Sequence, residues 1–206
     1  MESEIDAWLG TLPVPAEDGA AAHLVGRELP DLTLVDTAGL SRSLRALGKR
    51  LVLFVYPATG VPGRDPALDP APGWDQIPGA SGCTVHSLGY RERAERFAAL
   101  GFRVAALSAQ PRSEQAEFVA RNQIPFPVLN DSRFELAHTL RLPTFTVAGR
   151  TFYRRLSLVA VDQRLVHVTY PVFPPHRDAE QMLQWLERSP GTSLDVGASG
   201  AAAPLQ

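Results

Sequence analysis

The sequence predicts an α/β sandwich built around a mixed β-sheet. Three observations lead to this prediction. Apolar runs of strand length alternate with segments of helical periodicity, which is typical of a sheet flanked by helices. Near the end of the chain, two apolar runs flank a short polar turn, which indicates a hairpin and therefore antiparallel pairing in the sheet. The chain has 206 residues, 45% of them hydrophobic, which is enough for one domain with one good core.

The strands are predicted from continuous apolar runs. Residues 51–56 form such a run, and Pro57 ends it, as expected of a strand buried on both faces. The remaining predicted strands are Val104 to Leu107, Phe126 to Leu129, and a hairpin formed by Leu156 to Val161 and Leu165 to Val168 around Asp162-Gln163-Arg164.

The helices are predicted from apolar residues that recur every three or four positions. After Cys83, the residues Tyr90, Ala94, Phe97 and Ala98 follow this spacing and predict one helix. The other predicted helices are Ser113 to Asn122, a short one from Glu135 to Leu140, and a last one that carries Ala179, Met182, Leu183 and Leu186.

These elements form a single predicted domain over residues 24–188. Residues 1–23 are rich in alanine and acidic residues and predict a mobile N-terminal extension, and residues 189–206 predict a disordered tail. Residues 59–82 hold five prolines and five glycines, which indicates a long irregular loop. Trp74 and Ile77 favour a loop that folds back onto the domain, while a plain surface excursion stays an alternative.

Composition narrows the function classes. The formal net charge is −2 and no cluster of basic residues is present, so we expect no nucleic-acid partner. The first ten residues are acidic where a secretory signal is basic, and no segment has membrane-spanning length, so we expect a cytoplasmic protein without a membrane partner. One cysteine and five scattered histidines predict neither a metal site nor another cofactor.

Cys83 is the candidate reactive residue. It follows Ser81 and Gly82 and precedes Thr84 at the start of the first predicted helix. Unpaired backbone N–H groups at a helix N-terminus stabilise a thiolate, and the thiolate is the nucleophilic form of cysteine. A small buried core residue is the alternative interpretation. Residues 79–82 allow the backbone to approach a small ligand closely, which favours the interpretation of Cys83 as a reactive residue.

The order of these segments resembles the peroxiredoxins, which are thiol peroxidases with the thioredoxin fold, and most of all their bacterioferritin-comigratory or Q-type branch. The resemblance runs from about Gly26 to Glu187. It implies a thioredoxin-like three-layer sandwich with a mixed central β-sheet flanked by helices. The matching motifs are Gly26-Arg27-Glu28-Leu29-Pro30-Asp31-Leu32, Phe54-Val55-Tyr56-Pro57, Gly82-Cys83-Thr84, Tyr90-Arg91, Leu100-Gly101, Phe126-Pro127-Val128-Leu129-Asn130-Asp131 and Arg155-Leu156-Ser157-Leu158.

The resemblance implies that Cys83 attacks the terminal oxygen of a hydroperoxide and becomes a sulfenic acid. Arg155 then corresponds to the arginine that stabilises the thiolate and polarises the peroxide. Pro57 corresponds to the proline that shields the sulfenate. The other residues expected to bind the substrate are Ser81, Gly82 and Thr84.

The chain departs from the family pattern around the cysteine. Cys83 follows Pro57 by 26 residues, many more than in the family, so residues 59–82 contain an insertion. Ala80 stands where the family has a threonine, and Ser81 or Thr59 are the candidates to supply the missing hydroxyl. His86 stands where the family has an acidic residue, and it can accept a hydrogen bond from Arg155 only when neutral.

Leu88 occupies the position at which the Q-type branch often has a resolving cysteine, and the chain has no second cysteine. The resemblance therefore implies a one-cysteine peroxidase recycled by an external thiol or a redoxin, in a monomer or homodimer. Three alternatives stay open: a redox sensor, a Cys–His acyl-transfer enzyme that uses His86, and a non-catalytic thioredoxin-like binding scaffold.

Overall fold

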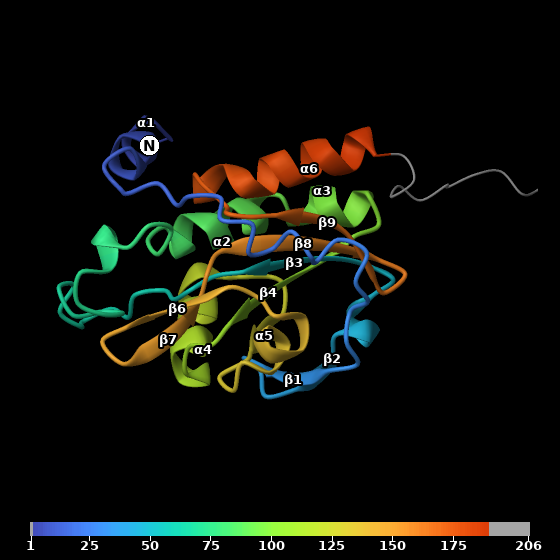
Figure 1. Ribbon diagram of the computed structural model, residues 1–206, viewed down its shortest axis with the longest axis horizontal. Helices are drawn as coiled ribbons and strands as arrows, with labels where there is room; N and C mark the ends of the chain where they lie inside the picture. Colours follow the sequence, from blue (N-terminus) through green and yellow to red (C-terminus); the bar gives the residue numbers. More distant parts are fainter. Residues whose placement is uncertain (1, 190–206) are drawn as a thin grey trace, which may run out of the picture.

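The computed structural model describes residues 2–189, which form a seven-stranded mixed sheet between layers of helices (Figure 1). The strand order is β2-β1-β5-β4-β3-β8-β9, and a separate hairpin pairs β6 with β7. Strands β3, β4 and β5 are parallel, whereas the remaining pairs are antiparallel. The α/β sandwich with a mixed sheet is confirmed.

The strands are β1 Thr33–Asp36, β2 Ser41–Ser43, β3 Arg50–Val55, β4 Arg103–Ser108, β5 Val128–Asn130, β6 Thr144–Val147, β7 Arg150–Tyr153, β8 Leu156–Val161 and β9 Arg164–Thr169. The α-helices are α1 Glu2–Leu9, α2 Cys83–Glu92, α3 Ala94–Ala99, α4 Arg112–Asn122, α5 Glu135–Leu140 and α6 Asp178–Arg188. Three 3-10 turns complete the described elements: η1 Arg45–Leu47, η2 Trp74–Gln76 and η3 Pro175–Arg177.

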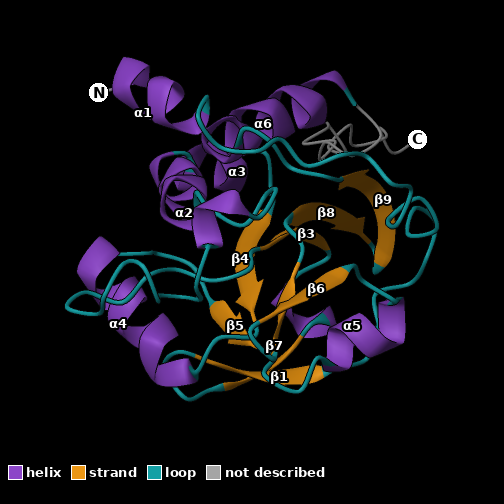
Figure 2. Cartoon of the chain, turned by 60° about the vertical axis from the view of Figure 1, so that its left-hand side comes forward, coloured by secondary structure: helices purple, strands orange, loops and turns teal. Residues whose placement is uncertain are grey.

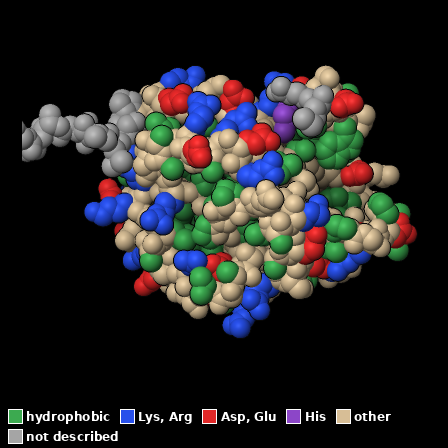
Figure 3. Space-filling view, turned by 180° about the vertical axis from the view of Figure 1, so that it is seen from behind, with side chains coloured by type: hydrophobic (Ala, Val, Ile, Leu, Met, Phe, Trp, Pro, Cys, Tyr) green, Lys and Arg blue, Asp and Glu red, His purple; other side chains and the backbone are tan. Residues whose placement is uncertain are grey.

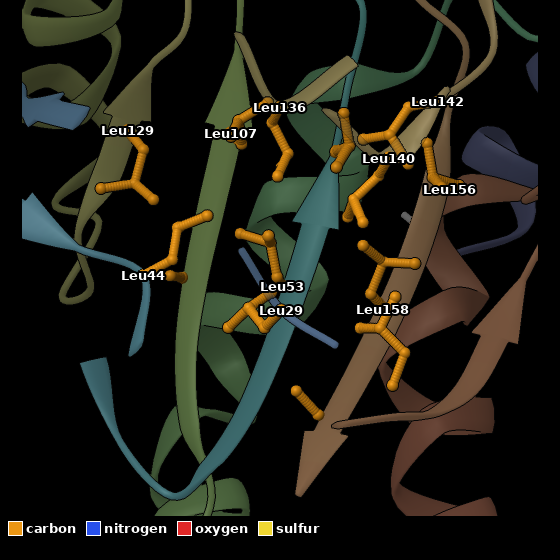
Figure 4. Packing of buried hydrophobic residues seen from close by; sticks show 14 of the residues in the cluster. Leu29, Leu44, Leu53, Leu107, Leu129, Leu136, Leu140, Leu142, Leu156 and Leu158 are labelled. Carbon is orange, nitrogen blue, oxygen red and sulfur yellow. The ribbon is translucent and has the colours of Figure 1, made fainter. Parts of the chain in front are cut away.

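Strand β3 divides the core into two halves because successive side chains of a strand point to opposite faces. Leu51, Leu53 and Val55 pack into a leucine-rich half with α5 and the chain before β2, part of which is drawn in Figure 4. Val52 and Phe54 pack into the other half with α2, α3, α4 and α6. Figure 2 shows α2, α3 and α6 on one side of the sheet and α5 on the other.

The structure differs from the sequence prediction at several places, and the short strands β1 and β2 are among the elements that were not predicted. The predicted helix after Cys83 is broken at Arg93, whose backbone is not helical, and so becomes α2 and α3. The hairpin of β6 and β7 was not predicted, because its side chains are mostly half-buried or exposed and form no apolar run. Residues 2–9 form α1 with a buried Leu9, a helix that was not predicted within the N-terminal extension.

The predicted C-terminal tail lies outside the described residues apart from Ser189. On the face drawn in Figure 3, basic and acidic side chains alternate without a continuous patch of either sign. Within residues 2–189, no helix is long and apolar enough to cross a membrane.

Candidate active site

Cys83 is the first residue of α2 and is buried, with 3% of its surface exposed. Gly82 precedes it with a φ of 97°, a left-handed conformation that strains any residue with a Cβ. A Cβ at Gly82 would also lie 2.5 Å from Cγ of Pro175, which begins η3. Gly82 therefore allows the backbone to pass close to Pro175 as α2 begins, and this path places the sulfur of Cys83.

Arg155 immediately precedes β8 and is also 3% exposed. Its Nη2 lies 3.1 Å from the Sγ of Cys83. The same nitrogen donates to the carbonyl oxygens of Ala80 and Ser81, each at 3.0 Å. These contacts fix a buried positive charge beside the sulfur.

His86 lies one turn into α2 and is fully buried. Its Nδ1 is 3.0 Å from Nη1 of Arg155, and its Nε2 is 2.9 Å from Oδ2 of Asp178, the first residue of α6. Burial lowers the pKa of His86 below its usual 6.5, against the opposing hydrogen bond and charge of Asp178. His86 is therefore neutral, which is the condition under which it can accept from Arg155.

Asp178 is buried, and the sequence analysis did not identify it. Burial opposes its ionisation, but hydrogen bonds from His86, Ser157 and Tyr90 outweigh burial and hold its pKa below the usual 3.8. In the sequence, Asp178 is an acidic residue at the start of a helix, a position that the helix dipole favours. That local pattern does not indicate a contact with His86.

A pocket of about 170 Å³ opens over Cys83. Thr59 and Trp74 lie in its wall, as do Ser81, Gly82 and Thr84 among the residues predicted from the sequence. Pro57 is not among the lining residues. The full lining is Trp8, Ala58, Thr59, Gly60, Asp69, Pro70, Trp74, Ser81, Gly82, Cys83, Thr84 and Val85.

Of the two hydroxyls considered as substitutes for the missing threonine, Ser81 donates its hydroxyl to Asp75. Thr59 follows β3 on the pocket wall, and its Oγ1 donates to Oε1 of Gln110 at 3.1 Å. Since the hydroxyl hydrogen of Thr59 is used on Gln110, its oxygen lone pairs are available to the pocket.

The insertion at residues 59–82 folds back onto the domain. Its Trp74 is 8% exposed and packs on Phe152 of β7 and Phe145 of β6, with ring centroids 4.9 and 5.8 Å apart. Arg150 of β7 donates to the carbonyl oxygen of Pro70 at 2.6 Å. The hairpin missed by the sequence analysis therefore supports the inserted wall of the Cys83 pocket.

A larger cavity of about 420 Å³ lies elsewhere, at the opposite ends of β3 and β4, where Leu51 and Val104 are among its lining residues. None of Cys83, Arg155 and His86 borders it. Of these three residues, Cys83 lines the smaller pocket, whereas Arg155 lines a separate pocket together with Gly79 and Tyr170.

Comparisons with known proteins agree with this architecture. The model of the Redoxin family matches residues 24–183. Peroxiredoxin bcp1 of Schizosaccharomyces pombe is 29% identical over 133 residues, which cover 63% of this chain and 58% of that protein. The chloroplastic peroxiredoxin Q of Triticum aestivum is 26% identical over 151 residues, covering 68% of this chain and 61% of that one. The chain thus spans about three fifths of the length of these curated relatives.

Solved structures show the same fold. Peroxidoxin BcpB of Mycobacterium tuberculosis superimposes with a TM-score of 0.64 at 24% identity, over 80% of this chain and 96% of that one. The bacterioferritin comigratory protein of Xanthomonas campestris gives a TM-score of 0.60 at 19% identity, over 86% and 97% of the two chains. The thioredoxin-like sandwich expected from the sequence is confirmed.

Proposed function

Because this chain belongs to the Redoxin family, we propose that it is a one-cysteine thiol peroxidase in which Cys83 reduces hydrogen peroxide or an organic hydroperoxide. One observation carries the proposal. The Nη2 of Arg155 lies 3.1 Å from Sγ of Cys83, and Cys83 itself lines a pocket of about 170 Å³. A buried guanidinium beside a cysteine at a helix N-terminus is the environment that activates a thiol.

In the proposed reaction, the Cys83 thiolate attacks the terminal oxygen of the hydroperoxide. The S–O bond forms as the O–O bond breaks, and the leaving oxygen takes up the proton that the thiol released. Sulfur is oxidised to a sulfenic acid, and the hydroperoxide is reduced to water or an alcohol. Arg155 stabilises the negative charge, which moves from sulfur to the leaving oxygen in the transition state.

Two groups in the pocket wall are suited to hold the substrate. The oxygen of Thr59 accepts a hydrogen bond from the hydroperoxide O–H, in place of the hydroxyl that Ala80 lacks. The first N–H groups of α2, at Cys83 and Thr84, have no acceptor within the helix and donate to the peroxide oxygens. Together these groups place the terminal oxygen next to sulfur.

Recycling requires an external reductant, because Cys83 is the only cysteine. One thiol displaces water from the sulfenic acid and forms a mixed disulfide with Cys83. A second thiol then attacks the mixed disulfide, which restores Cys83 and releases the oxidised reductant as a disulfide. A low-molecular-weight thiol or a redoxin provides these two thiols.

Stopped-flow oxidation of the reduced protein tests the proposal, with hydrogen peroxide and an organic hydroperoxide as oxidants. Trp8 and Trp74 line the pocket, so intrinsic fluorescence reports the reaction. We expect fast oxidation, dimedone labelling of Cys83, and loss of both in Cys83→Ser. Oxidation no faster than that of a free thiol would contradict the peroxidase and favour the binding scaffold. Fast oxidation without turnover by thiols or redoxins would favour the redox sensor.

A further inference from the structure

We propose that Asp178 is a positioning residue of this site: it acts through His86 to supply the hydrogen-bond acceptor that holds Arg155 against Cys83. The proposal rests on the proposed peroxidase function, which it deepens. The three side chains come from separate parts of the chain, α6, α2 and the start of β8, and each is at most 3% exposed.

Hydrogen-bonding capacity fixes the protonation state of His86. A guanidinium has donors and no acceptor, so the Nδ1 of His86, 3.0 Å from Nη1 of Arg155, must carry a lone pair. The proton of the neutral ring is then on Nε2, which lies 2.9 Å from Oδ2 of Asp178 and donates to it. The other tautomer would set an N–H against the guanidinium and leave the carboxylate without this donor.

Asp178 is itself held in place independently of Arg155. Its Oδ2 accepts from the hydroxyl of Tyr90 at 2.7 Å and from that of Ser157 at 2.6 Å. The residue is 1% exposed and stands at the N-terminus of α6, where the helix dipole favours a negative charge. A fixed carboxylate therefore selects the His86 tautomer, and the tautomer selects the orientation of Arg155.

Separating the carboxylate from Arg155 has an electrostatic consequence. A carboxylate in direct contact with the guanidinium would compensate much of its positive charge. Here neutral His86 touches Arg155, and the balancing charge of Asp178 lies on the far side of the ring. His86 thereby orients the guanidinium through Nη1. More of the positive charge stays uncompensated near Nη2, which lies next to the sulfur.

The first test measures the wild-type protein, and a variant serves only to assign the signal of His86. We label the histidines with ¹⁵N and record the ring nitrogen shifts from about pH 6 to about pH 8, assigning His86 by its loss in His86→Asn. The expected signal is a ring that is neutral and protonated at Nε2 at neutral pH. A ring protonated at Nδ1, or one that is cationic at neutral pH, would overturn the proposal.

The second test replaces Asp178 with asparagine, which keeps the shape and removes the charge that selects the tautomer. We expect a mixture of His86 tautomers and a loss of about 10–100-fold in the rate constant for hydroperoxide, the range known for residues that orient metal ligands through a hydrogen bond. Met182→Ala is the matched structural control, since Met182 is buried one turn further along α6 and outside this cluster. It should lower stability without altering the His86 signal.

A double-mutant cycle separates positioning from simple packing. The amide oxygen of His86→Asn can replace Nδ1 as an acceptor, so this variant should be oxidised faster than His86→Phe, which has no acceptor. Adding Asp178→Asn to His86→Asn should cost much less than in the wild type, because the coupling runs through the imidazole. Equal costs in both backgrounds, or wild-type rates in folded Asp178→Asn, would overturn the proposal.

The outcomes also separate this proposal from the function on which it rests. If wild-type Cys83 reacts no faster than a free thiol, the peroxidase proposal fails. The positioning proposal then fails as a statement about catalysis, even if the His86 signal shows the expected tautomer. If the wild type is oxidised fast and Asp178→Asn matches it, the positioning proposal alone fails.

Discussion

Replacing Arg155 with methionine removes the guanidinium that lies 3.1 Å from Sγ of Cys83 and keeps a side chain of similar reach. Two opposite unit charges at this separation attract by about 5 kcal/mol at an effective dielectric constant of ~20. The carbonyl oxygens of Ala80 and Ser81 also contact the same nitrogen, so part of its charge is already compensated. Losing one donor to a developing anion costs about 3–4 kcal/mol, so we expect an oxidation rate about 10²–10³-fold lower.

The assay is the second-order rate constant for hydrogen peroxide, measured by stopped-flow tryptophan fluorescence at several peroxide concentrations. Arg154→Met is the matched control, because Arg154 is the neighbouring residue and its guanidinium lies over the ring of Phe145, 5.9 Å from the centroid, rather than at the sulfur. Circular dichroism and a thermal melt establish that both variants are folded. Folded Arg155→Met that is oxidised within about threefold of the wild type would refute the electrostatic argument, since removing a transition-state donor costs far more.

Three further predictions concern stability, each measured by urea unfolding. Trp74→Ala should lower the free energy of unfolding by about 3 kcal/mol because it removes the buried anchor of the insertion. Leu68→Ala, at a position that is 61% exposed in the same loop, should change the free energy of unfolding by less than about 0.5 kcal/mol. Similar losses in the Trp74 and Leu68 variants would show that the insertion is not docked. Gly82→Ala should lower the free energy of unfolding by about 1–3 kcal/mol more than Gly19→Ala. Both glycines have a positive φ, but only a Cβ at position 82 would lie 2.5 Å from a proline ring. Equal losses in the two variants would argue against that contact. Burial lowers the pKa of His86 in the folded state, so the unfolded chain binds the proton first as the pH falls. The contribution of His86 to stability should therefore be complete above about pH 6.5. Below that pH, the free energy of unfolding should fall by up to about 1.4 kcal/mol per pH unit. His86→Asn should flatten this slope, and an unchanged slope would mean that the imidazole does not stay neutral.

Much of the central sheet could be predicted from the sequence. The apolar run over residues 51–56 corresponds to β3, and the turn around Asp162-Gln163-Arg164 joins β8 and β9 as predicted. These features depend on neighbours two to four residues apart, which the sequence displays directly. The short strands β1 and β2 were missed because strands of three or four residues carry little apolar pattern.

The candidate site was predicted in part. Cys83 could be found from its residues alone, because a glycine-rich turn before a helix is a local feature. Arg155 needed the resemblance to a family, since an arginine at the start of a strand is otherwise ordinary. Pro57 was assigned to the substrate site but does not line the pocket, whereas Thr59, two residues later, does.

The amino-acid sequence by itself determined most strands and helices of the core and the candidate reactive cysteine at the start of α2. Only the tertiary structure decided which side chains surround that cysteine. Cys83 and Arg155 are 72 residues apart in the chain, and His86 and Asp178 are 92 apart. Periodicity records the neighbours along one element, but which charged side chains meet in the interior depends on how distant elements pack. That packing placed a carboxylate of α6 behind the histidine of α2, where no local pattern marked it.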